Sequence, residues 1–171
     1  MSPQLPPLSL VLGGQRSGKS VYAENLIGDM PAIYLATGEA LDAEMSARIA
    51  RHKQRRGGGW SAVEEPLDLA TALARHDVAG RPVLLDSLGM WVANLLGGGK
   101  NVALETSGLL NTVKNLTCPL VVVSDEAGLG VIPDNALARQ YLDALGTANQ
   151  GLAAAADSVV LVIAGLPQKL K

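Results

Sequence analysis

Cysteine is almost absent from this chain of 171 residues, in which Cys118 is the only one. A single cysteine excludes an internal disulfide and a cysteine-rich metal site, so we expect a buried thiol in a reducing compartment. Apolar runs of the roughly 18 residues that a membrane span needs are also missing, and the N-terminus lacks a charged-then-apolar signal pattern. These absences predict a cytoplasmic protein without a transmembrane segment.

A large excess of charge of one sign is lacking too. The formal net charge is −2, which argues against a general nucleic-acid-binding surface, so we expect no nucleic-acid partner. Hydrophobic residues make up 48% of the chain and charged residues 18%, a balance typical of folded proteins. We find no long linker and no internal repeat, which predicts one catalytic domain over residues 1–171.

A glycine-rich stretch is the most informative feature that is present. Residues 13–20, GGQRSGKS, fit the pattern G-x-x-x-x-G-K-[ST] between an apolar run typical of a buried strand and a segment typical of a helix. Glycines let the backbone wrap around phosphate oxygens, and loop amides at the helix N-terminus supply positive potential. The alternative is a strand-to-helix turn that matches by accident. We predict a nucleoside triphosphate site made by Gly13, Gly14, Gln15, Arg16, Ser17, Gly18, Lys19 and Ser20.

Within that site, residue types assign two roles. The Lys19 ammonium is expected to reach the β- and γ-phosphates, and the Ser20 hydroxyl is expected to hold Mg²⁺. Asp86 supplies a second candidate metal ligand, because an apolar strand that ends in an acid resembles the Walker B strand. A purely structural strand-end residue is the alternative. Residues 86–89 also match the D-x-x-G switch signature of GTPases, but the guanine-reading sequence N-K-x-D is missing from the chain.

Strands and helices alternate along the chain. Continuous runs of Val, Leu and Ile, rather than alternating ones, mark strands that are buried on both faces. The pattern predicts an α/β fold of the P-loop NTPase type, with a mostly parallel sheet and helices on both faces. The expected strands are 8–12, 32–36, 61–64, 82–86, 120–124 and 159–163, the last of which closes the sheet. The expected helices are 21–27, 41–56, one that Pro66 opens at its first turn, 90–96, 104–116 and 133–156.

A basic cluster surrounds one of the two histidines. Five of the fourteen Lys and Arg residues fall within residues 48–56, with no acid among them and His52 in the middle. The ordinary interpretation is a solvated helix face with a structural histidine. Neighbouring cations, however, disfavour imidazolium, so they keep His52 neutral and nucleophilic while attracting a triphosphate. This suits an enzyme that forms a covalent nucleotidyl-histidine. His76 is expected at a helix end or on the surface.

Taken in order, these motifs resemble one enzyme family over Leu10 to Lys171. It is the bifunctional adenosylcobinamide kinase/adenosylcobinamide-phosphate guanylyltransferase family of cobalamin biosynthesis. Besides the glycine-rich stretch and Asp86, the residues that carry the resemblance are YLAT at 34–37, DAEM at 42–45, RIARH at 48–52, Trp60, EEPL at 64–67, NLL at 94–96, EAGLGVIP at 126–133 and NQGLA at 149–153.

The resemblance implies two reactions. The first phosphorylates the aminopropanol hydroxyl of adenosylcobinamide with ATP or GTP, and the second transfers GMP from GTP to adenosylcobinamide phosphate through a guanylylated histidine, matched by His52. It also implies Mg²⁺ as cofactor and a homotrimer. Asp125 departs from the family, which commonly has Asn there, and the change bears on hydrogen bonding at the nucleotide or corrinoid edge. The further nucleotide contacts that the resemblance implies are Ala36, Thr37, Gly38, Arg55, Arg56, Gly57, Gly58, Glu64 and Asp86.

Two alternatives from other classes stay open at this point. A simple P-loop kinase would use the same glycine-rich loop without a covalent intermediate, and His52 with its basic neighbours argues against it. A regulatory GTP-binding module would change conformation without transferring GMP, and the missing N-K-x-D sequence argues against that.

Overall fold

A computed structural model describes residues 5–38 and 59–171 of the chain. The strands are β1 (Leu8–Gly13), β2 (Ala32–Ala36), β3 (Trp60–Glu64), β4 (Val83–Asp86), β5 (Leu120–Asp125), β6 (Ser158–Ile163) and β7 (Leu166–Lys169). The helices are α1 (Lys19–Ile27), α3 (Leu69–Arg75), α4 (Leu88–Gly97), α5 (Val102–Val113) and α6 (Ala136–Ala155). The helix expected over 41–56 lies outside the described residues.

The strands form one sheet in the order β3-β2-β4-β5-β1-β6-β7. Neighbours from β3 to β6 pair in parallel, and β7 pairs with β6 in the antiparallel sense. The mostly parallel sheet that was predicted is therefore confirmed. Because β5 lies between β1 and β4, the carboxyl ends of these three strands meet at one edge, where ligands bind in open α/β sheets.

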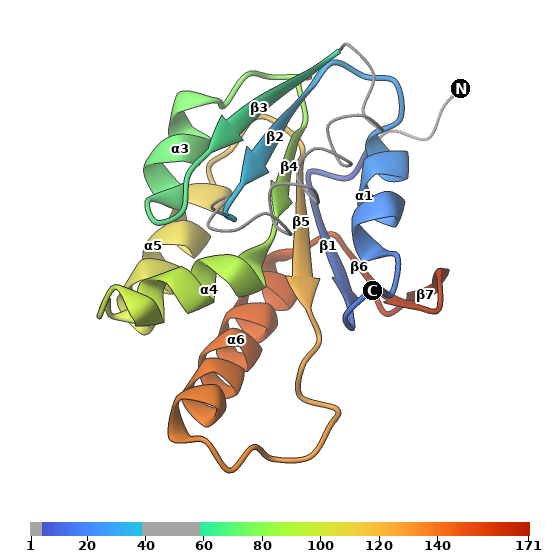
Figure 1. Ribbon diagram of the computed structural model, residues 1–171. Coiled ribbons are helices and arrows are strands. Elements are labelled where there is room, and N and C mark those ends of the chain that lie inside the picture. Colours follow the sequence, from blue (N-terminus) through green and yellow to red (C-terminus); the bar gives the residue numbers. More distant parts are fainter. Residues whose placement is uncertain (1–4, 39–58) are drawn as a thin grey trace.

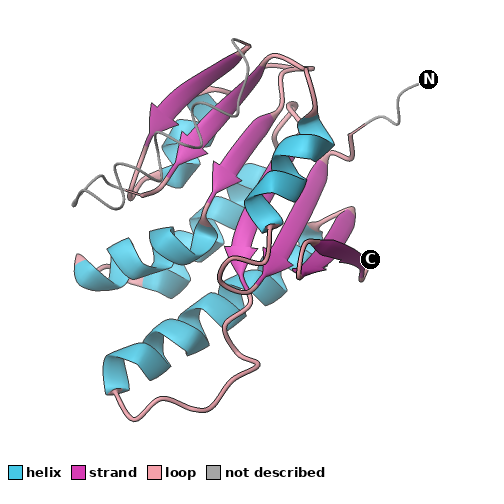
Figure 2. Ribbon diagram, turned by 45° about the vertical axis from the view of Figure 1, so that its right-hand side comes forward, coloured by secondary structure: helices cyan, strands magenta, loops and turns pink. Residues whose placement is uncertain are grey.

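Helices cover both faces of the sheet, with α1 on one face and α3, α4, α5 and α6 on the other (Figures 1 and 2). Each face has its own hydrophobic core. Within β5, Val122 belongs to the core under the four helices, whereas Val121 and Val123 belong to the core under α1. Successive side chains of a strand point to opposite faces, so a strand covered on both sides needs a continuous apolar run.

Two helices begin later in the chain than the positions of Pro66 and Pro133 predicted. Pro66 precedes α3, whose first turn is capped by the Asp68 side chain at 3.1 Å from the backbone N of Thr71. Pro133 precedes α6, whose cap is Asn135. Both expected starts were wrong. Each helix begins where a side chain accepts a hydrogen bond from a free backbone N–H of the first turn. The fixed φ of proline suits the loop before the helix equally well.

A third helix is shifted along the chain in the same way. The helix expected over 104–116 runs from Val102 to Val113, since the Asn101 side chain accepts a hydrogen bond from the backbone N of Leu104 at 3.1 Å and caps the helix earlier.

The strand over 159–163 was expected to close the sheet. That expectation was wrong, because β7 lies outside β6 at the sheet edge.

The β6–β7 hairpin turns through Ala164 and Gly165, both with positive φ, as a type I′ turn requires. The strand β7 was missed because all four of its residues are exposed and one of them is Pro167, so it has no alternating apolar pattern. The hairpin also contacts the glycine-rich loop, because the backbone N of Gly165 donates to the carbonyl oxygen of Ser17 at 2.8 Å.

Cys118 lies two residues before β5 and is buried, as the sequence predicted. Burial, followed by the hydrogen bond and charge of Asp77, raises the pKa of its thiol to about 11. The thiol therefore stays protonated and unreactive at neutral pH. Within residues 5–38 and 59–171, no helix combines the length and the apolar character needed to cross a membrane.

Candidate nucleotide-binding site

The glycine-rich loop connects β1 to α1, as the motif predicted. A Cβ at Gly13 would meet the Ser17 side chain and lie 2.8 Å from the Val162 carbonyl oxygen, so only glycine fits there. Gly18 caps α1 with φ 95°, a left-handed conformation that glycine adopts without strain. The loop is closed by a hydrogen bond from the backbone N of Ser17 to the Gly14 carbonyl oxygen at 3.2 Å.

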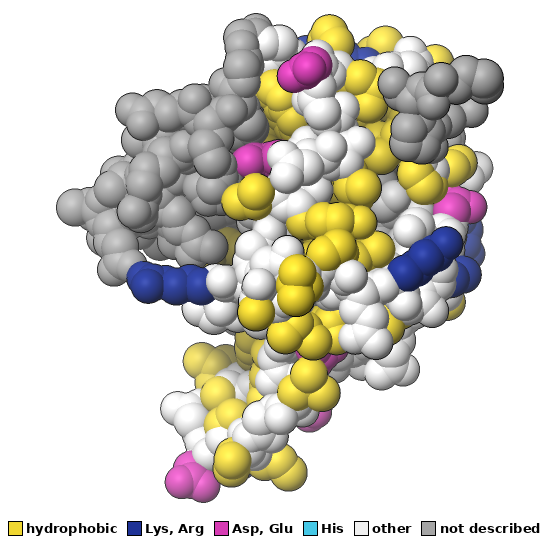
Figure 3. All heavy atoms as spheres, turned by 90° about the vertical axis from the view of Figure 1, so that its right-hand side faces the viewer, with side chains coloured by type: hydrophobic (Ala, Val, Ile, Leu, Met, Phe, Trp, Pro, Cys, Tyr) yellow, Lys and Arg dark blue, Asp and Glu magenta, His cyan; other side chains and the backbone are white. Residues whose placement is uncertain are grey.

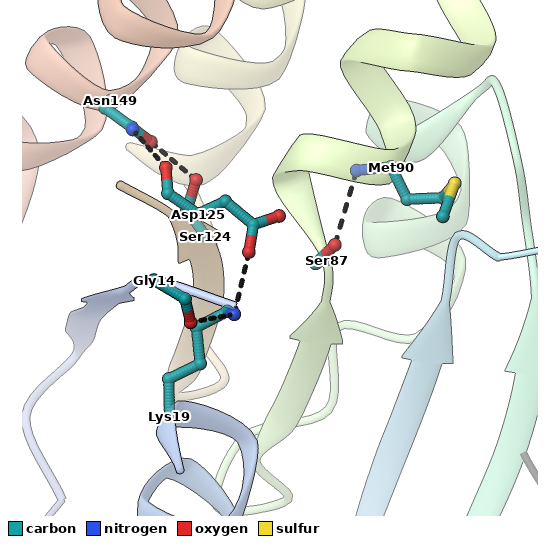
Figure 4. Close-up of polar contacts among 7 residues, drawn as sticks. All are labelled: Gly14, Lys19, Ser87, Met90, Ser124, Asp125 and Asn149. Atoms are coloured by element: carbon teal, nitrogen blue, oxygen red, sulfur yellow. Dashed lines mark hydrogen bonds and ion pairs between the residues drawn. The ribbon is translucent and has the colours of Figure 1, made fainter. Parts of the chain in front are cut away.

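Lys19 opens α1, and its side chain is 7% exposed. Its Nζ donates to the Gly14 carbonyl oxygen at 3.1 Å and forms an ion pair with Asp125 Oδ1 at 2.7 Å. Figure 4 shows the side chain reaching from the first turn of the helix to the end of β5. The ammonium is thus fixed at the carboxyl edge of the sheet, where the sequence predicted a phosphate contact.

Asp125 is held in place by residues of α4 and α6. The Asn149 Nδ2 donates to the Asp125 carbonyl oxygen at 3.1 Å, and Asn149 Oδ1 accepts from Ser124 Oγ at 2.6 Å (Figure 4). A Cβ on Gly89 would lie 2.5 Å from Asp125 Oδ2 and 2.9 Å from the Tyr141 hydroxyl, so the carboxylate packs directly against the first turn of α4. Burial and then the charge of Asp125 raise the pKa of Tyr141 to about 12, which keeps the phenol protonated.

Asp86 ends β4 at the same edge. It pairs in register with Val123, whereas Asp125 pairs with Gly13, so the two carboxylates lie on neighbouring strands beside the loop. Asp86 Oδ2 accepts a hydrogen bond from the Tyr34 hydroxyl at 3.1 Å. Among the described residues, no three His, Cys, Asp or Glu side chains are grouped to hold a metal ion by themselves.

The predicted nucleotide contacts at the ends of β2 and β3 differ from one another in exposure. Ala36 and Glu64 pair in register at those ends, and the Glu64 side chain is exposed. Thr37 is fully buried, and its hydroxyl donates to the Ser87 carbonyl oxygen at 2.7 Å and accepts from the Ser87 backbone N at 2.9 Å. The side chain of Thr37 therefore joins β2 to the start of α4, and Gly38 follows it directly.

Asn94 of α4 completes this connection. Its Nδ2 donates to the carbonyl oxygens of Thr37 at 2.8 Å and of Pro66 at 3.1 Å, so one amide ties the ends of β2 and β3 to the helix. The sequence motifs contained Asn94 and Asn149 without a role. A polar side chain on the inner face of an apolar helix is the signal that would have identified both, because buried polar groups need partners.

Thr37→Val removes the hydroxyl and keeps the shape of the side chain. We expect a loss of about 2 kcal/mol in the free energy of unfolding, because the backbone N–H and carbonyl of Ser87 lose their partner. Urea unfolding followed by circular dichroism measures it. The matched control is Thr147→Val, where an exposed hydroxyl bonds only within its own helix and about 0.5 kcal/mol or less is expected. Equal losses in the two variants would contradict the structural role of Thr37.

The remaining predicted residues include the basic cluster. His52, Arg55, Arg56, Gly57 and Gly58 lie outside the described residues. The other histidine, His76, is the C-cap of α3 and is half-buried, which confirms its expected place at a helix end.

Comparison with known proteins identifies the family. The family model described as cobinamide kinase / cobinamide phosphate guanyltransferase matches residues 9–170. The chain belongs to this family. The bifunctional adenosylcobalamin biosynthesis protein CobP of Pseudomonas aeruginosa is 42% identical over 166 residues, which cover 95% of this chain and 96% of CobP. The protein CobU of Salmonella typhimurium is 39% identical over 178 residues, covering 95% and 98%.

Family membership confirms the resemblance itself and the bifunctional type of enzyme that it implied. The chain is a member of a family of bifunctional enzymes of cobalamin biosynthesis, and the family's two transfer reactions use nucleotide substrates. The expectation of a bifunctional kinase and nucleotidyltransferase with a phosphate loop is therefore confirmed at the level of the family.

Solved structures of low sequence identity support the fold alone. The P4 protein of bacteriophage phi6 in complex with ADP aligns with a TM-score of 0.53 and 16% identity over 97% of this chain and 58% of P4. An ATPase of a bacterial type III secretion system aligns with a TM-score of 0.57 and 11% identity over 96% of this chain and 57% of the ATPase. The chain thus spans little more than half of either neighbour, and the predicted P-loop NTPase fold is confirmed.

Proposed function

We propose that this chain carries out both reactions of its family, first as an adenosylcobinamide kinase and then as an adenosylcobinamide-phosphate guanylyltransferase. The observation that carries the proposal is the fixed position of the Lys19 ammonium at the carboxyl edge of the sheet, between the glycine-rich loop and the end of β5. Residues 1–171 act as one catalytic domain, in the cytoplasm, where ATP and GTP are available.

In the first reaction, the aminopropanol hydroxyl oxygen of adenosylcobinamide bonds to the γ-phosphorus of ATP or GTP. The bond from that phosphorus to the β–γ bridging oxygen breaks, the nucleoside diphosphate leaves, and the hydroxyl proton is released. The protein takes little part in the covalent chemistry of phosphoryl transfer. Positioning of the two substrates and neutralisation of phosphate charge therefore dominate catalysis. Lys19 and the amides of residues 13–20 supply both.

In the second reaction, an imidazole nitrogen of His52 bonds to the α-phosphorus of GTP, and pyrophosphate leaves. A phosphate oxygen of adenosylcobinamide phosphate then bonds to the same phosphorus, the P–N bond breaks, and adenosylcobinamide-GDP and free histidine result. The basic neighbours support this role, because they keep the imidazole neutral and attract the triphosphate. Arg55, Arg56, Gly57, Gly58, Glu64 and Ala36 to Gly38 are the proposed nucleotide contacts.

The residues at the edge of the sheet fit Mg²⁺. Hydroxyl and carboxylate oxygens are the ligands that Mg²⁺ prefers, and it is commonly bound by one or two carboxylates together with substrate phosphates. Ser20 and Asp86 would hold it together with the phosphates. When bound, Mg²⁺ neutralises charge on the β- and γ-phosphates.

Asp86→Asn keeps the acceptor for Tyr34 but removes the charge. The Mg²⁺ concentration for half-maximal kinase activity is expected to rise at least about tenfold, since loss of even an outer-shell partner of a metal ligand costs this much affinity. A Mg²⁺ titration of the initial rate measures it. The control is Asp29→Asn, an exposed aspartate after α1. Identical Mg²⁺ dependence in wild type and Asp86→Asn would make Asp86 a structural strand-end residue.

We propose a homotrimer as the assembly. The loop between β5 and α6 protrudes from the body of the molecule (Figure 1), and the hydrophobic side chains of Leu129, Val131 and Ile132 on it are 81%, 95% and 77% exposed. Figure 3 shows hydrophobic side chains at this protruding end. Exposed apolar groups of this size support a protein contact. Light scattering coupled to size-exclusion chromatography measures the subunit number, and a monomer at micromolar concentration would contradict the proposal.

One labelling experiment separates the proposed function from its alternatives. The protein is incubated with α-labelled GTP and analysed by denaturing electrophoresis. A label that is labile to acid and stable to base supports a phosphoramidate on histidine. A kinase without a covalent intermediate, or a GTP-binding module, would carry no label. Formation of adenosylcobinamide phosphate and adenosylcobinamide-GDP is followed in the same preparation.

A further inference from the structure

The lysine of the glycine-rich loop already has a carboxylate partner. An ammonium group has three N–H donors, of which Lys19 directs one to the Gly14 carbonyl oxygen and one to Asp125 Oδ1 at 2.7 Å. The positive charge that Lys19 offers to a triphosphate is therefore largely balanced by a negative charge from β5. Phosphates that contact Lys19 must share it with Asp125 or compete for it.

The Asp125 carboxylate is confined to this place. The backbone of Glu126 donates to the Gly13 carbonyl oxygen at 3.0 Å, and Asn149 holds the Asp125 carbonyl, so the end of β5 is attached to both β1 and α6. On its other side, Asp125 Oδ2 packs against Gly89, where even a methyl group would not fit. The Asp125 side chain is 29% exposed, and these attachments hold it beside the loop.

A second carboxylate adds to this charge. Asp86 ends the neighbouring strand at the same edge, so a metal-free triphosphate would approach two carboxylates and a lysine whose charge is already balanced. A divalent cation bound to the phosphates removes most of this repulsion. An asparagine at 125 would bond to Lys19 without adding charge.

We infer that Asp125 is a positioning residue that makes the glycine-rich loop selective for metal-loaded nucleotide. Its carboxylate competes with metal-free phosphates for Lys19 and repels them, whereas nucleotide that carries Mg²⁺ is accepted. The inference rests on the proposed function, because it requires a triphosphate at this loop.

The test is the dissociation constant of ATP for the full chain, measured by calorimetry with Mg²⁺ and with EDTA. In Asp125→Asn, the Kd for metal-free ATP should fall about tenfold or more, the scale of removing one like charge at contact distance. The Kd for Mg²⁺-ATP should change less than about threefold. The ratio of the Kd for metal-free ATP to the Kd for Mg²⁺-ATP therefore falls. A purely structural role of Asp125 would not lower this ratio.

Two further variants complete the experiment. Asp143→Asn makes the same change of formal charge on the exposed side of α6 and should keep the wild-type ratio. Asp125→Ser removes the charge in a second way and should lower the ratio as Asp125→Asn does, with circular dichroism confirming that each variant is folded. A ratio that is unchanged in both Asp125 variants overturns the inference alone. Absence of ATP binding to wild type under both conditions overturns the proposed function as well.

Discussion

Replacement of His52 by asparagine is expected to lower GMP transfer by at least about 10⁴-fold, a scale seen when a catalytic nucleophile is removed. The physical reason is that an amide nitrogen has no lone pair available to attack the α-phosphorus, so no activated nucleotide forms. Phosphorylation of adenosylcobinamide needs only the glycine-rich loop and the metal, so it should persist at a substantial rate. Both products are measured in one preparation of the variant.

The matched control is the other histidine of the chain. His76→Asn changes the C-cap of α3 and should leave both reactions and the protein label from α-labelled GTP intact. Undiminished GMP transfer in His52→Asn would refute the histidine intermediate. An equal loss of both reactions would instead make the basic segment around His52 a nucleotide clamp that both reactions share.

Lys19→Met should lower both reactions by about 10²–10³-fold, the loss that follows removal of one charge-stabilising donor. Methionine keeps an unbranched apolar stem in the buried position that Lys19 occupies, so the packing of the first turn of α1 is retained. The ammonium alone is lost, and with it the contact to phosphates in either reaction. Initial rates of both products at saturating Mg²⁺ and nucleotide measure the effect.

Stability should change little in this variant. The partner that Lys19→Met leaves behind, Asp125, is exposed enough to be hydrated, so a shift within about 1 kcal/mol is expected in urea unfolding. Lys114→Met, an exposed lysine at the end of α5, is the control for removing a positive charge. Unchanged kinase rates in Lys19→Met would show that the glycine-rich loop does not bind the transferred phosphate.

The parts of the fold that could be predicted are those encoded in short stretches of sequence. The run Leu120–Ser124 identifies a strand by itself, because both of its faces are buried. Strand β7 could not be predicted, since its exposed residues form an edge hairpin that depends on β6 rather than on a core. Helix starts at Asp68 and Asn135 were misplaced because proline and capping side chains compete as signals within a few residues of each other.

The same distinction applies to the site. The glycine-rich loop is contiguous in sequence, so its place between a strand and a helix could be predicted. The ion pair of Lys19 with Asp125 joins residues far apart in the chain, and it exists only because β5 enters the sheet beside β1. The buried role of Thr37 has the same origin, because its partner Ser87 follows a different strand. Sequence motifs could identify these residues as candidates, but they could not predict the contacts between them.

The place of β1 in the sheet has a consequence for how the protein is made. Its two neighbours are β5 and β6, so the strand that the ribosome produces first has no partners until the last third of the chain has emerged. Pairing across such sequence separations is slow, and an apolar strand that waits for partners exposes the nascent chain to aggregation. The turn at Gly165, which supports the loop at Ser17, is translated later still. The nucleotide site therefore cannot form during most of synthesis, although its motif is the first to be translated.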